Sequence, residues 1–206
     1  MDTAKAISAA TVATGAVGVA LLLLIERVAL REFADAEVEQ LFGSALLIAA
    51  GLATVGVMIV ISGQRRATKR EPRAGFLAAL CIGAVQGLCL PFRGFSRSGA
   101  TISTALFLGV DKLRAEAFSF ALAVVLTPPV ILREGYRLAK ASGANAANPA
   151  SVAQLAVPSL LGMLFSFLAG LVALRWLSHG LERSRWHWFG YYCLVAAAAV
   201  ALFGLR

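Results

Sequence analysis

A polar segment rich in arginine, serine and glycine interrupts an otherwise apolar stretch at residues 84 to 103. Within it, the run RGFSRSGAT places two arginines, three hydroxyl side chains and two glycines inside nine residues. Polar groups among residues that prefer hydrocarbon are costly to bury, so such a cluster needs partners or a ligand. The candidate ligand-contacting residues of this run are Arg93, Gly94, Ser96, Arg97, Ser98, Gly99 and Thr101.

The chemistry that this spacing predicts is the binding of a phosphate-like anion. Gly94 and Gly99 permit a tight turn and a close approach of the backbone, and Ser98 or Gly99 would lie near the start of the following helix. Free N–H groups and the positive end of the helix dipole at such a start attract phosphate. Arg97 adds a fixed fork of donors for the phosphate oxygens.

A structural alternative exists for the same residues. Ser98 could simply cap a helix, while Arg93 and Arg97 could extend their charged ends to a membrane interface. The density of donors between two apolar segments favours an anion site over this alternative. Residue types alone neither identify the anion nor distinguish hydrolysis from transport.

The elements that must position this segment are membrane helices. The 206 residues are 59% hydrophobic and only 15% charged, with a mean hydropathy of +0.79, and apolar runs of roughly 20 residues recur along the chain. This composition predicts an all-α integral membrane protein, a polytopic helical bundle forming a single membrane domain over residues 1–206. The predicted spans are 7–25, 42–61, 115–132, 152–174 and 187–205, with a re-entrant hairpin over 75–110.

Two features refine these spans. The first apolar run is long and lacks a convincing cleavage site, which favours a retained helix over a signal peptide. Pro128 and Pro129 are expected to kink or break the fourth element, because each removes a backbone donor, and Arg133 and Glu134 are expected to end it. The sequence after them is polar and flexible in composition.

The net charge of +8 reflects membrane topology rather than nucleic-acid binding, because the basic residues lie in short connectors. Connector 63–74 carries five arginines and lysines and is predicted to be cytoplasmic by the positive-inside rule. The connector after the span 152–174, residues 175–185, is also basic. The aromatic residues predicted to form a belt at the membrane interface are Trp186, Trp188, Tyr191 and Tyr192.

No chemical role is predicted for the cysteine and histidine residues. Cys81, Cys89 and Cys193 all fall within apolar stretches and are expected to be small buried hydrophobic residues. His179 and His187 lie in the last basic connector, distant in sequence from the SRSGAT run, and are expected to be solvated or interfacial.

The run LPFRGFSRSGATIS, a following Leu108–Gly109 pair and AFSFALAV from Ala117 resemble the second signature of the undecaprenyl-diphosphate phosphatase family associated with bacitracin resistance. Gln86 lies where this family tends to have a glutamine ahead of the proline. The sequence departs from the family pattern in having Phe92 and Arg93 between Pro91 and Gly94. A larger departure is that nothing in residues 1–83 resembles the family's N-terminal glutamate-rich signature.

The resemblance implies a fold of inverted repeats, each with a re-entrant hairpin, of which this chain resembles the second repeat and part of the first. It implies hydrolysis of undecaprenyl diphosphate, a polyprenyl diphosphate lipid, to undecaprenyl phosphate and phosphate. This reaction recycles the lipid carrier of cell-wall synthesis in the bacterial inner membrane and confers resistance to bacitracin. The site would face the periplasm.

The resemblance also assigns roles to individual residues. Arg97, Ser96 and Ser98 would act at the reacting diphosphate. The residues expected to bind substrate around them are Arg93, Gly94, Gly99, Thr101 and Gln86. A divalent cation, Mg²⁺ or Ca²⁺, is implied by the resemblance, but the sequence identifies no ligands for it. Glu26 and Glu116 lie nearest to membrane depth and are expected to be interfacial charges at helix ends rather than catalytic bases.

Three alternatives stay open at this point. The chain could bind lipid phosphates without hydrolysing them, it could transport them, since broken helices and a midplane anion site are also features of transporters, or it could be a truncated inactive member. A homo-oligomer is not excluded, although the basic bias of connector 63–74 argues against an antiparallel dimer. No nucleic-acid partner is expected.

Overall fold

The computed structural model describes residues 3–29, 44–64, 75–92, 94–143, 149–182 and 185–204, and these residues form helices and short turns without strands. Five of the helices are long and apolar enough to cross a membrane. The predicted class, an all-α polytopic membrane bundle, is therefore confirmed.

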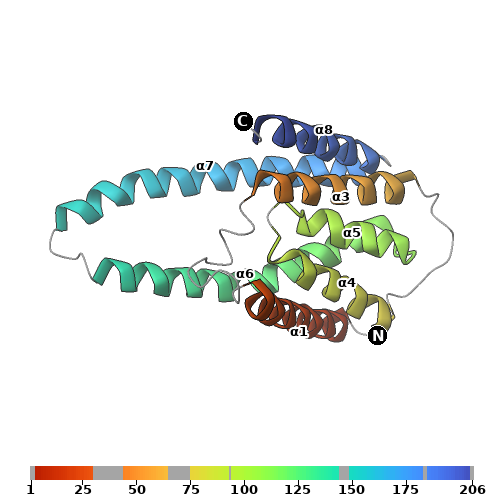
Figure 1. The fold of residues 1–206 in the computed structure, drawn as a ribbon, viewed down its shortest axis with the longest axis horizontal. Coiled ribbons are helices and arrows are strands. Elements are labelled where there is room, and N and C mark those ends of the chain that lie inside the picture. The colour runs from red at the N-terminus through yellow and green to blue at the C-terminus, as the bar shows by residue number, and fades with distance from the viewer. Residues whose placement is uncertain are drawn as a thin grey trace.

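The described residues form seven helices (Figure 1). Their bounds are α1 Thr3–Ala29, α3 Ala45–Gln64, α4 Phe76–Cys89, α5 Arg97–Phe107, α6 Lys112–Gly143, α7 Pro149–Glu182 and α8 Trp186–Gly204.

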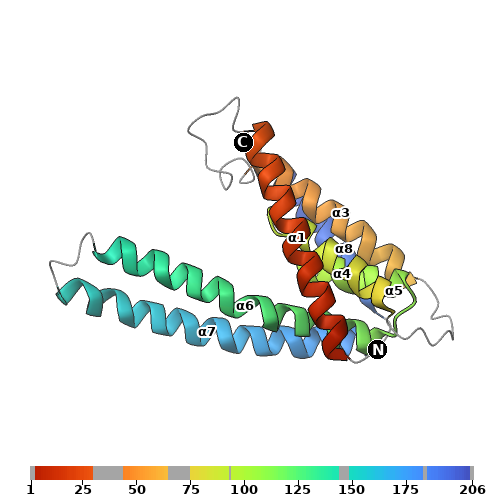
Figure 2. The same ribbon diagram turned by 90° about the horizontal axis from the view of Figure 1, so that it is seen from below.

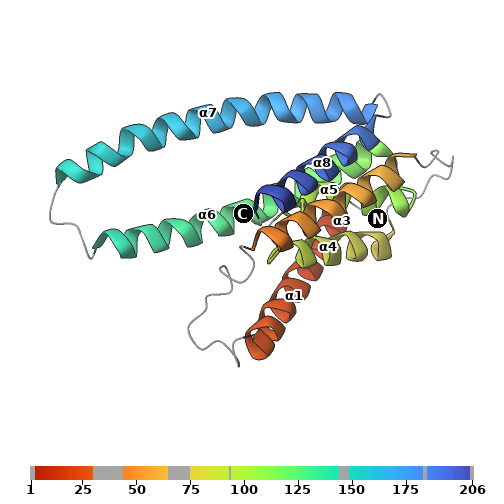
Figure 3. The same ribbon diagram turned by 45° about the horizontal axis from the view of Figure 1, so that its top comes forward.

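Glycines bring the helices of the bundle into close contact. On α4, a Cβ at Gly83 would lie 2.2 Å from the Ala10 carbonyl oxygen of α1, and one at Gly87 would lie 2.6 Å from the Thr14 carbonyl oxygen. Small residues spaced four apart let helix backbones approach in this way, and van der Waals contact then holds them together. Gly56 and Gly190 do the same for α3 and α8, which lie side by side in Figure 3.

The short helices α4 and α5 form a hairpin inside this bundle, and α5 packs against α3, α4 and α6 (Figure 1). With 14 and 11 residues, they extend about 21 Å and 17 Å, less than the roughly 30 Å of a bilayer's hydrocarbon core. The predicted helix, polar loop and half-helix are therefore present. The second helix begins at Arg97, earlier than the apolar segment at Ile102 suggests.

Pro128 and Pro129 were expected to kink or break their helix, and a break is wrong, because α6 continues through both to Gly143. The two prolines withdraw backbone donors only from the carbonyls one turn earlier, and the remaining hydrogen bonds preserve the helix. Arg133 and Glu134 lie within α6, so part of the polar connector predicted after them is helical.

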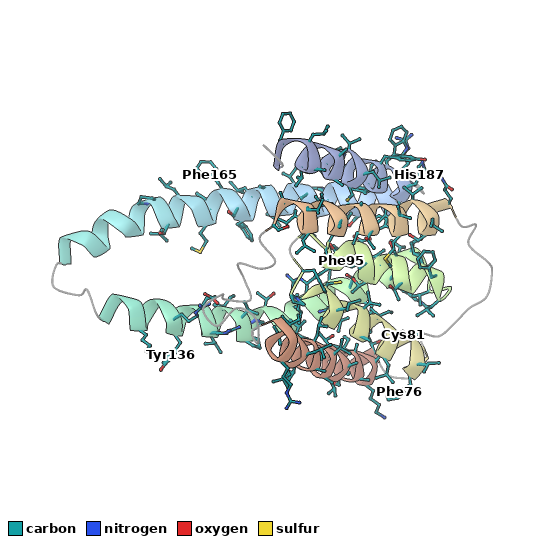
Figure 4. The ribbon with its side chains drawn as sticks, in the orientation of Figure 1. Phe76, Cys81, Phe95, Tyr136, Phe165 and His187 are labelled. Carbon is teal, nitrogen blue, oxygen red and sulfur yellow. The ribbon has the colours of Figure 1, made fainter. Side chains whose placement is uncertain are left out.

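The far parts of α6 and α7, residues 124–143 and 149–174, project beyond the other helices (Figure 2). Their side chains are largely exposed where the structure describes them. Tyr136 and Phe165 lie on these projecting parts and point away from each other (Figure 4).

Three expectations about single side chains need correction. Trp186 is buried at the start of α8, so it does not belong to an exposed aromatic belt, whereas Trp188, Tyr191 and Tyr192 are exposed. His179 and His187 lie within α7 and α8 rather than in a connector.

The expectation for the cysteines holds for one of the three. Cys89 is buried, whereas Cys81 and Cys193 are partly exposed.

Candidate functional site

The turn between α4 and α5 depends on a glycine at position 94. Gly94 has a φ of +85°, in the left-handed region that side chains with a Cβ disfavour. A Cβ at this position would also lie 2.6 Å from the carbonyl oxygen of Ile48 on α3. The predicted tight turn and close backbone approach at Gly94 are therefore present, and they press the turn against the first turns of α3.

The start of α5 presents backbone donors at this turn. Ser96 is the N-cap, and its hydroxyl oxygen accepts a hydrogen bond from the Gly99 N–H at 3.2 Å. The first helical hydrogen bond runs from Ala100 N–H to the Ser96 carbonyl at 2.9 Å. The N–H groups of Arg97 and Ser98 therefore have no acceptor within the helix and remain available to an anion, together with the positive end of the helix dipole.

The sequence-predicted residues divide into an outer and an inner set. Arg97 is exposed and Ser96 and Ser98 are partly buried, so these three meet at the accessible start of α5. Gly99 is buried, and a Cβ there would lie 2.8 Å from Val55 Cγ1, which shows that α5 approaches α3 closely at this point.

Two more predicted binding residues lie elsewhere. Gln86 is buried within α4, 3% exposed. Arg93 lies outside the described residues.

Thr101 connects α5 to α6. It is 1% exposed, its hydroxyl donates to the Arg97 carbonyl at 2.8 Å, and it lies 2.7 Å from the Ser119 hydroxyl of α6. Ser119 belongs to the AFSFALAV segment, to which sequence reasoning gave no role of its own. The structure shows that this serine and the SRSGAT run form one buried contact that fixes the α5 backbone at Arg97.

Glu116 differs from its expected place at an interface. It is 6% exposed in α6, and the Ser178 hydroxyl of α7 donates a hydrogen bond to its carboxylate. A carboxyl group near a helix end is shielded from water when a second helix packs over it. Here the shielding residue is Ser178, which is 62 positions later in the sequence. Sequence spacing carries no signal for such a contact.

The bundle has two distinct ends, which we call the Ser96 end and the Trp186 end. Gly94 contacts Ile48 near the start of α3, whereas a Cβ at Gly63, near the end of α3, would lie 2.7 Å from the His187 backbone nitrogen. The 15 residues between Ile48 and Gly63 separate these contacts by about 22 Å. Glu116 contacts Ser178 of α7, and it lies about one helical turn before Ser119, which contacts Thr101 in the second turn of α5.

A divalent cation does not fit the described residues of the Ser96 end. Mg²⁺ and Ca²⁺ are bound mainly by carboxylate and carbonyl oxygens, but the side chains gathered at the start of α5 are an arginine and two serines. Across the described residues, no group of three or more His, Cys, Asp or Glu side chains could hold a metal ion. What this arrangement can do is hold an anion through Arg97, two amide N–H groups and hydroxyl donors.

Comparison with known proteins places this geometry in context. The family model described as bacitracin resistance protein BacA matches residues 1–199. Undecaprenyl-diphosphatase 2 of Acinetobacter baylyi is 50% identical over 192 residues, which are 93% of this chain and 67% of that protein. Undecaprenyl-diphosphatases of Desulfatibacillum aliphaticivorans and Korarchaeum cryptofilum are 36% and 31% identical, each over 79% of this chain.

These matches cover most of this chain but only part of each relative. They cover 55% of the Desulfatibacillum protein and 56% of the Korarchaeum protein, so the chain spans between about half and two thirds of the length of the curated relatives it matches. The family match also begins at residue 1 and so extends over α1 and α3, beyond the segments that carry the resemblance in the sequence.

Proposed function

The chain belongs to the bacitracin resistance protein BacA family, and on that basis we propose that it hydrolyses undecaprenyl diphosphate to undecaprenyl phosphate and phosphate. The substrate class follows from the relatives, which are named undecaprenyl-diphosphatases. The product would be the lipid carrier that cell-wall synthesis reuses. Regeneration of this carrier would confer resistance to bacitracin.

The observation that carries the proposal is the start of α5. Ser96 caps the helix through Gly99, which leaves the N–H groups of Arg97 and Ser98 directed outward beside an exposed guanidinium. A diphosphate bound there would have its oxygens neutralised by one arginine and by the helix N-terminus. Ser96 and Ser98 would orient it.

In the proposed reaction, water attacks the terminal phosphorus and the bond from that phosphorus to the bridging oxygen breaks. Arg97 and the amide N–H groups would stabilise the charge that spreads over the phosphate oxygens. The water proton must pass to a base, and no described carboxylate lies at the start of α5. We therefore place the base outside the described residues, and we assign no step to the divalent cation that the family resemblance implies.

We propose further that the Ser96 end faces the periplasm and the Trp186 end the cytoplasm of a bacterial inner membrane. The chain is a multi-pass membrane protein, and α3 ends beside the start of α8. The basic connectors that follow α3 and precede α8 in the sequence therefore meet the bundle at one end. The positive-inside rule places that end in the cytoplasm.

A cysteine at position 68 tests this orientation. In a chain whose three native cysteines are replaced, Thr68→Cys should resist a membrane-impermeant maleimide in intact spheroplasts and react after lysis. Asn145→Cys, in the connection between α6 and α7, should react in both. Labelling of Thr68→Cys in intact spheroplasts would show that the proposed orientation is inverted.

A binding protein without hydrolysis is the second candidate function. It is favoured by one observation, which is that the described residues at the start of α5 supply positive charge and donors but no carboxylate. Positive charge alone binds a diphosphate without activating water. In this case the chain would hold or present the lipid, and hydrolysis would need a carboxylate that the described residues do not supply.

Phosphate release by the purified chain distinguishes the two functions. We expect release from farnesyl diphosphate in detergent with Mg²⁺ or Ca²⁺, reduced about 100-fold by Arg97→Ala because the charge of the reacting phosphates is no longer compensated. Binding of the diphosphate without any release of phosphate would refute hydrolysis by this chain and support the binding function.

A further inference from the structure

A pocket lies at the Trp186 end, formed where α7 turns into α8. Its volume is about 600 Å³, within the range of small-molecule sites. Four aromatic and two basic side chains line it: Trp176, Trp188, Phe189, Tyr192, His179 and Arg185. None of the lining side chains that the structure describes is acidic.

The backbone turn and one aromatic ring give this pocket its shape. The Arg185 N–H donates to the Gly180 carbonyl at 2.8 Å, which brings α8 back against α7. The Phe189 ring packs edge-on against Trp176, with ring centroids 6.2 Å apart, and lies 5.6 Å from Trp186. A Cβ at Gly180 would lie 2.6 Å from the Phe189 ring, so glycine is required for this approach.

The rim of the pocket is built from amphipathic aromatic residues. Trp176, Trp188 and Tyr192 are 73%, 62% and 73% exposed. Tryptophan and tyrosine with one apolar and one polar edge are enriched where a membrane protein meets lipid head groups. His187 packs against Trp188 and Tyr191 beside this rim, at the start of α8 (Figure 4).

The chemistry of the lining indicates the ligand class. Arg185 offers a planar fork of donors that matches phosphate oxygens, His179 adds a further donor, and the rings suit the glycerol and upper acyl segments of a lipid. The pocket lies beside His187, which contacts the end of α3, whereas the Gly94 turn that precedes α5 contacts the beginning of α3, and these two contacts are about 22 Å apart along α3. We propose that this pocket binds the phosphate head group of an anionic phospholipid, independently of the diphosphate site.

Tryptophan fluorescence reports directly on this pocket, because two of the three tryptophans line it and the third packs against Phe189. The chain is reconstituted in brominated phosphatidylcholine, which quenches tryptophan, and the quenching is relieved by unbrominated phosphatidylglycerol or phosphatidylcholine. We expect phosphatidylglycerol to relieve quenching at roughly one fifth of the mole fraction that phosphatidylcholine requires. Equal relief by the two lipids in the unaltered chain would overturn the proposal.

Paired variants distinguish lipid binding in the pocket from attraction of the lipid by general surface charge. Arg185→Gln should abolish the preference for phosphatidylglycerol, and Arg185→Lys should keep part of it. Arg114→Gln removes the same charge from an exposed position near the start of α6, outside the pocket, and should leave the preference unchanged. An equal loss in Arg185→Gln and Arg114→Gln would show surface attraction rather than a site.

Two further arms test the source of the phosphate and the shape of the cavity. Inorganic phosphate at about 10 mM should not compete with phosphatidylglycerol, and full competition would mean that the site binds the free ion instead. Gly180→Leu should fill the pocket and abolish the preference while every charge is kept. A preference that survives Gly180→Leu would show that the lipid binds outside the pocket. All of these readouts are independent of hydrolysis.

Discussion

Replacing Arg97 with alanine is expected to weaken binding of a lipid diphosphate about 100-fold. Arg97 is exposed at the first residue of α5, where the N–H groups of Arg97 and Ser98 lack helical acceptors. Two charge-assisted hydrogen bonds lost together correspond to about 3 kcal/mol, or roughly two powers of ten in affinity. Titration calorimetry in detergent with a methylene-diphosphonate analogue of farnesyl diphosphate measures the change without turnover.

The conservative variant distinguishes charge from geometry at this position. Arg97→Lys keeps the charge but not the planar fork, so we expect an affinity between those of the unaltered chain and Arg97→Ala. Arg114→Ala, an exposed arginine at the Trp186 end, should bind normally. If Arg97→Ala bound the analogue as tightly as the unaltered chain, the start of α5 would not be the anion site.

Adding a single methyl group at Gly83 is expected to destabilise the bundle by about 3 kcal/mol, the upper end of the range for overpacking. The new Cβ would lie 2.2 Å from the Ala10 carbonyl oxygen and 2.7 Å from the Ala10 Cα, both backbone atoms that cannot rotate away. The helices would have to separate, which would also strain the 2.9 Å hydrogen bond from the Thr14 hydroxyl to the Gly83 carbonyl. Thermal unfolding of Gly83→Ala in detergent measures the loss.

Gly15 on α1 provides the matched control for this substitution. A Cβ at Gly15 has no neighbouring atom within 4 Å, and alanine favours the helix by up to about 1 kcal/mol over glycine. Gly15→Ala should therefore unfold at the same temperature as the unaltered chain or slightly above it. Equal stability of Gly83→Ala and the unaltered chain would contradict the packing of α4 on α1.

The proposed diphosphate-binding segment is the part of the site whose local structure follows most directly from the sequence. Gly94 adopts the positive φ expected of a tight turn, and Arg97, Ser96 and Ser98 gather at a helix N-terminus as their spacing predicts. These are local properties, because a turn and the cap that follows it involve residues within a few positions of each other. The precise cap was not predictable from composition, since Ser96 and Ser98 compete for the same role.

The course of the proline-containing helix shows where local rules fail. Pro128 and Pro129 are strong helix breakers in water, yet α6 continues for a further 14 residues to Gly143. Apolar surroundings offer no alternative partners to the remaining backbone groups, so the helix is retained wherever most of its hydrogen bonds survive. A rule that treats every proline as a helix breaker does not distinguish a helix in water from a helix in apolar surroundings.

The sequence by itself determined the membrane class, most of the helical segments and the turn before α5, because hydropathy, turn chemistry and helix capping depend on neighbours along the chain. Only the tertiary structure decided which distant residues meet. It paired Thr101 with Ser119, covered Glu116 with Ser178 and buried Trp186. It also formed the pocket between α7 and α8. These contacts depend on how helices pack, where close approach at glycines selects one arrangement that no local pattern encodes.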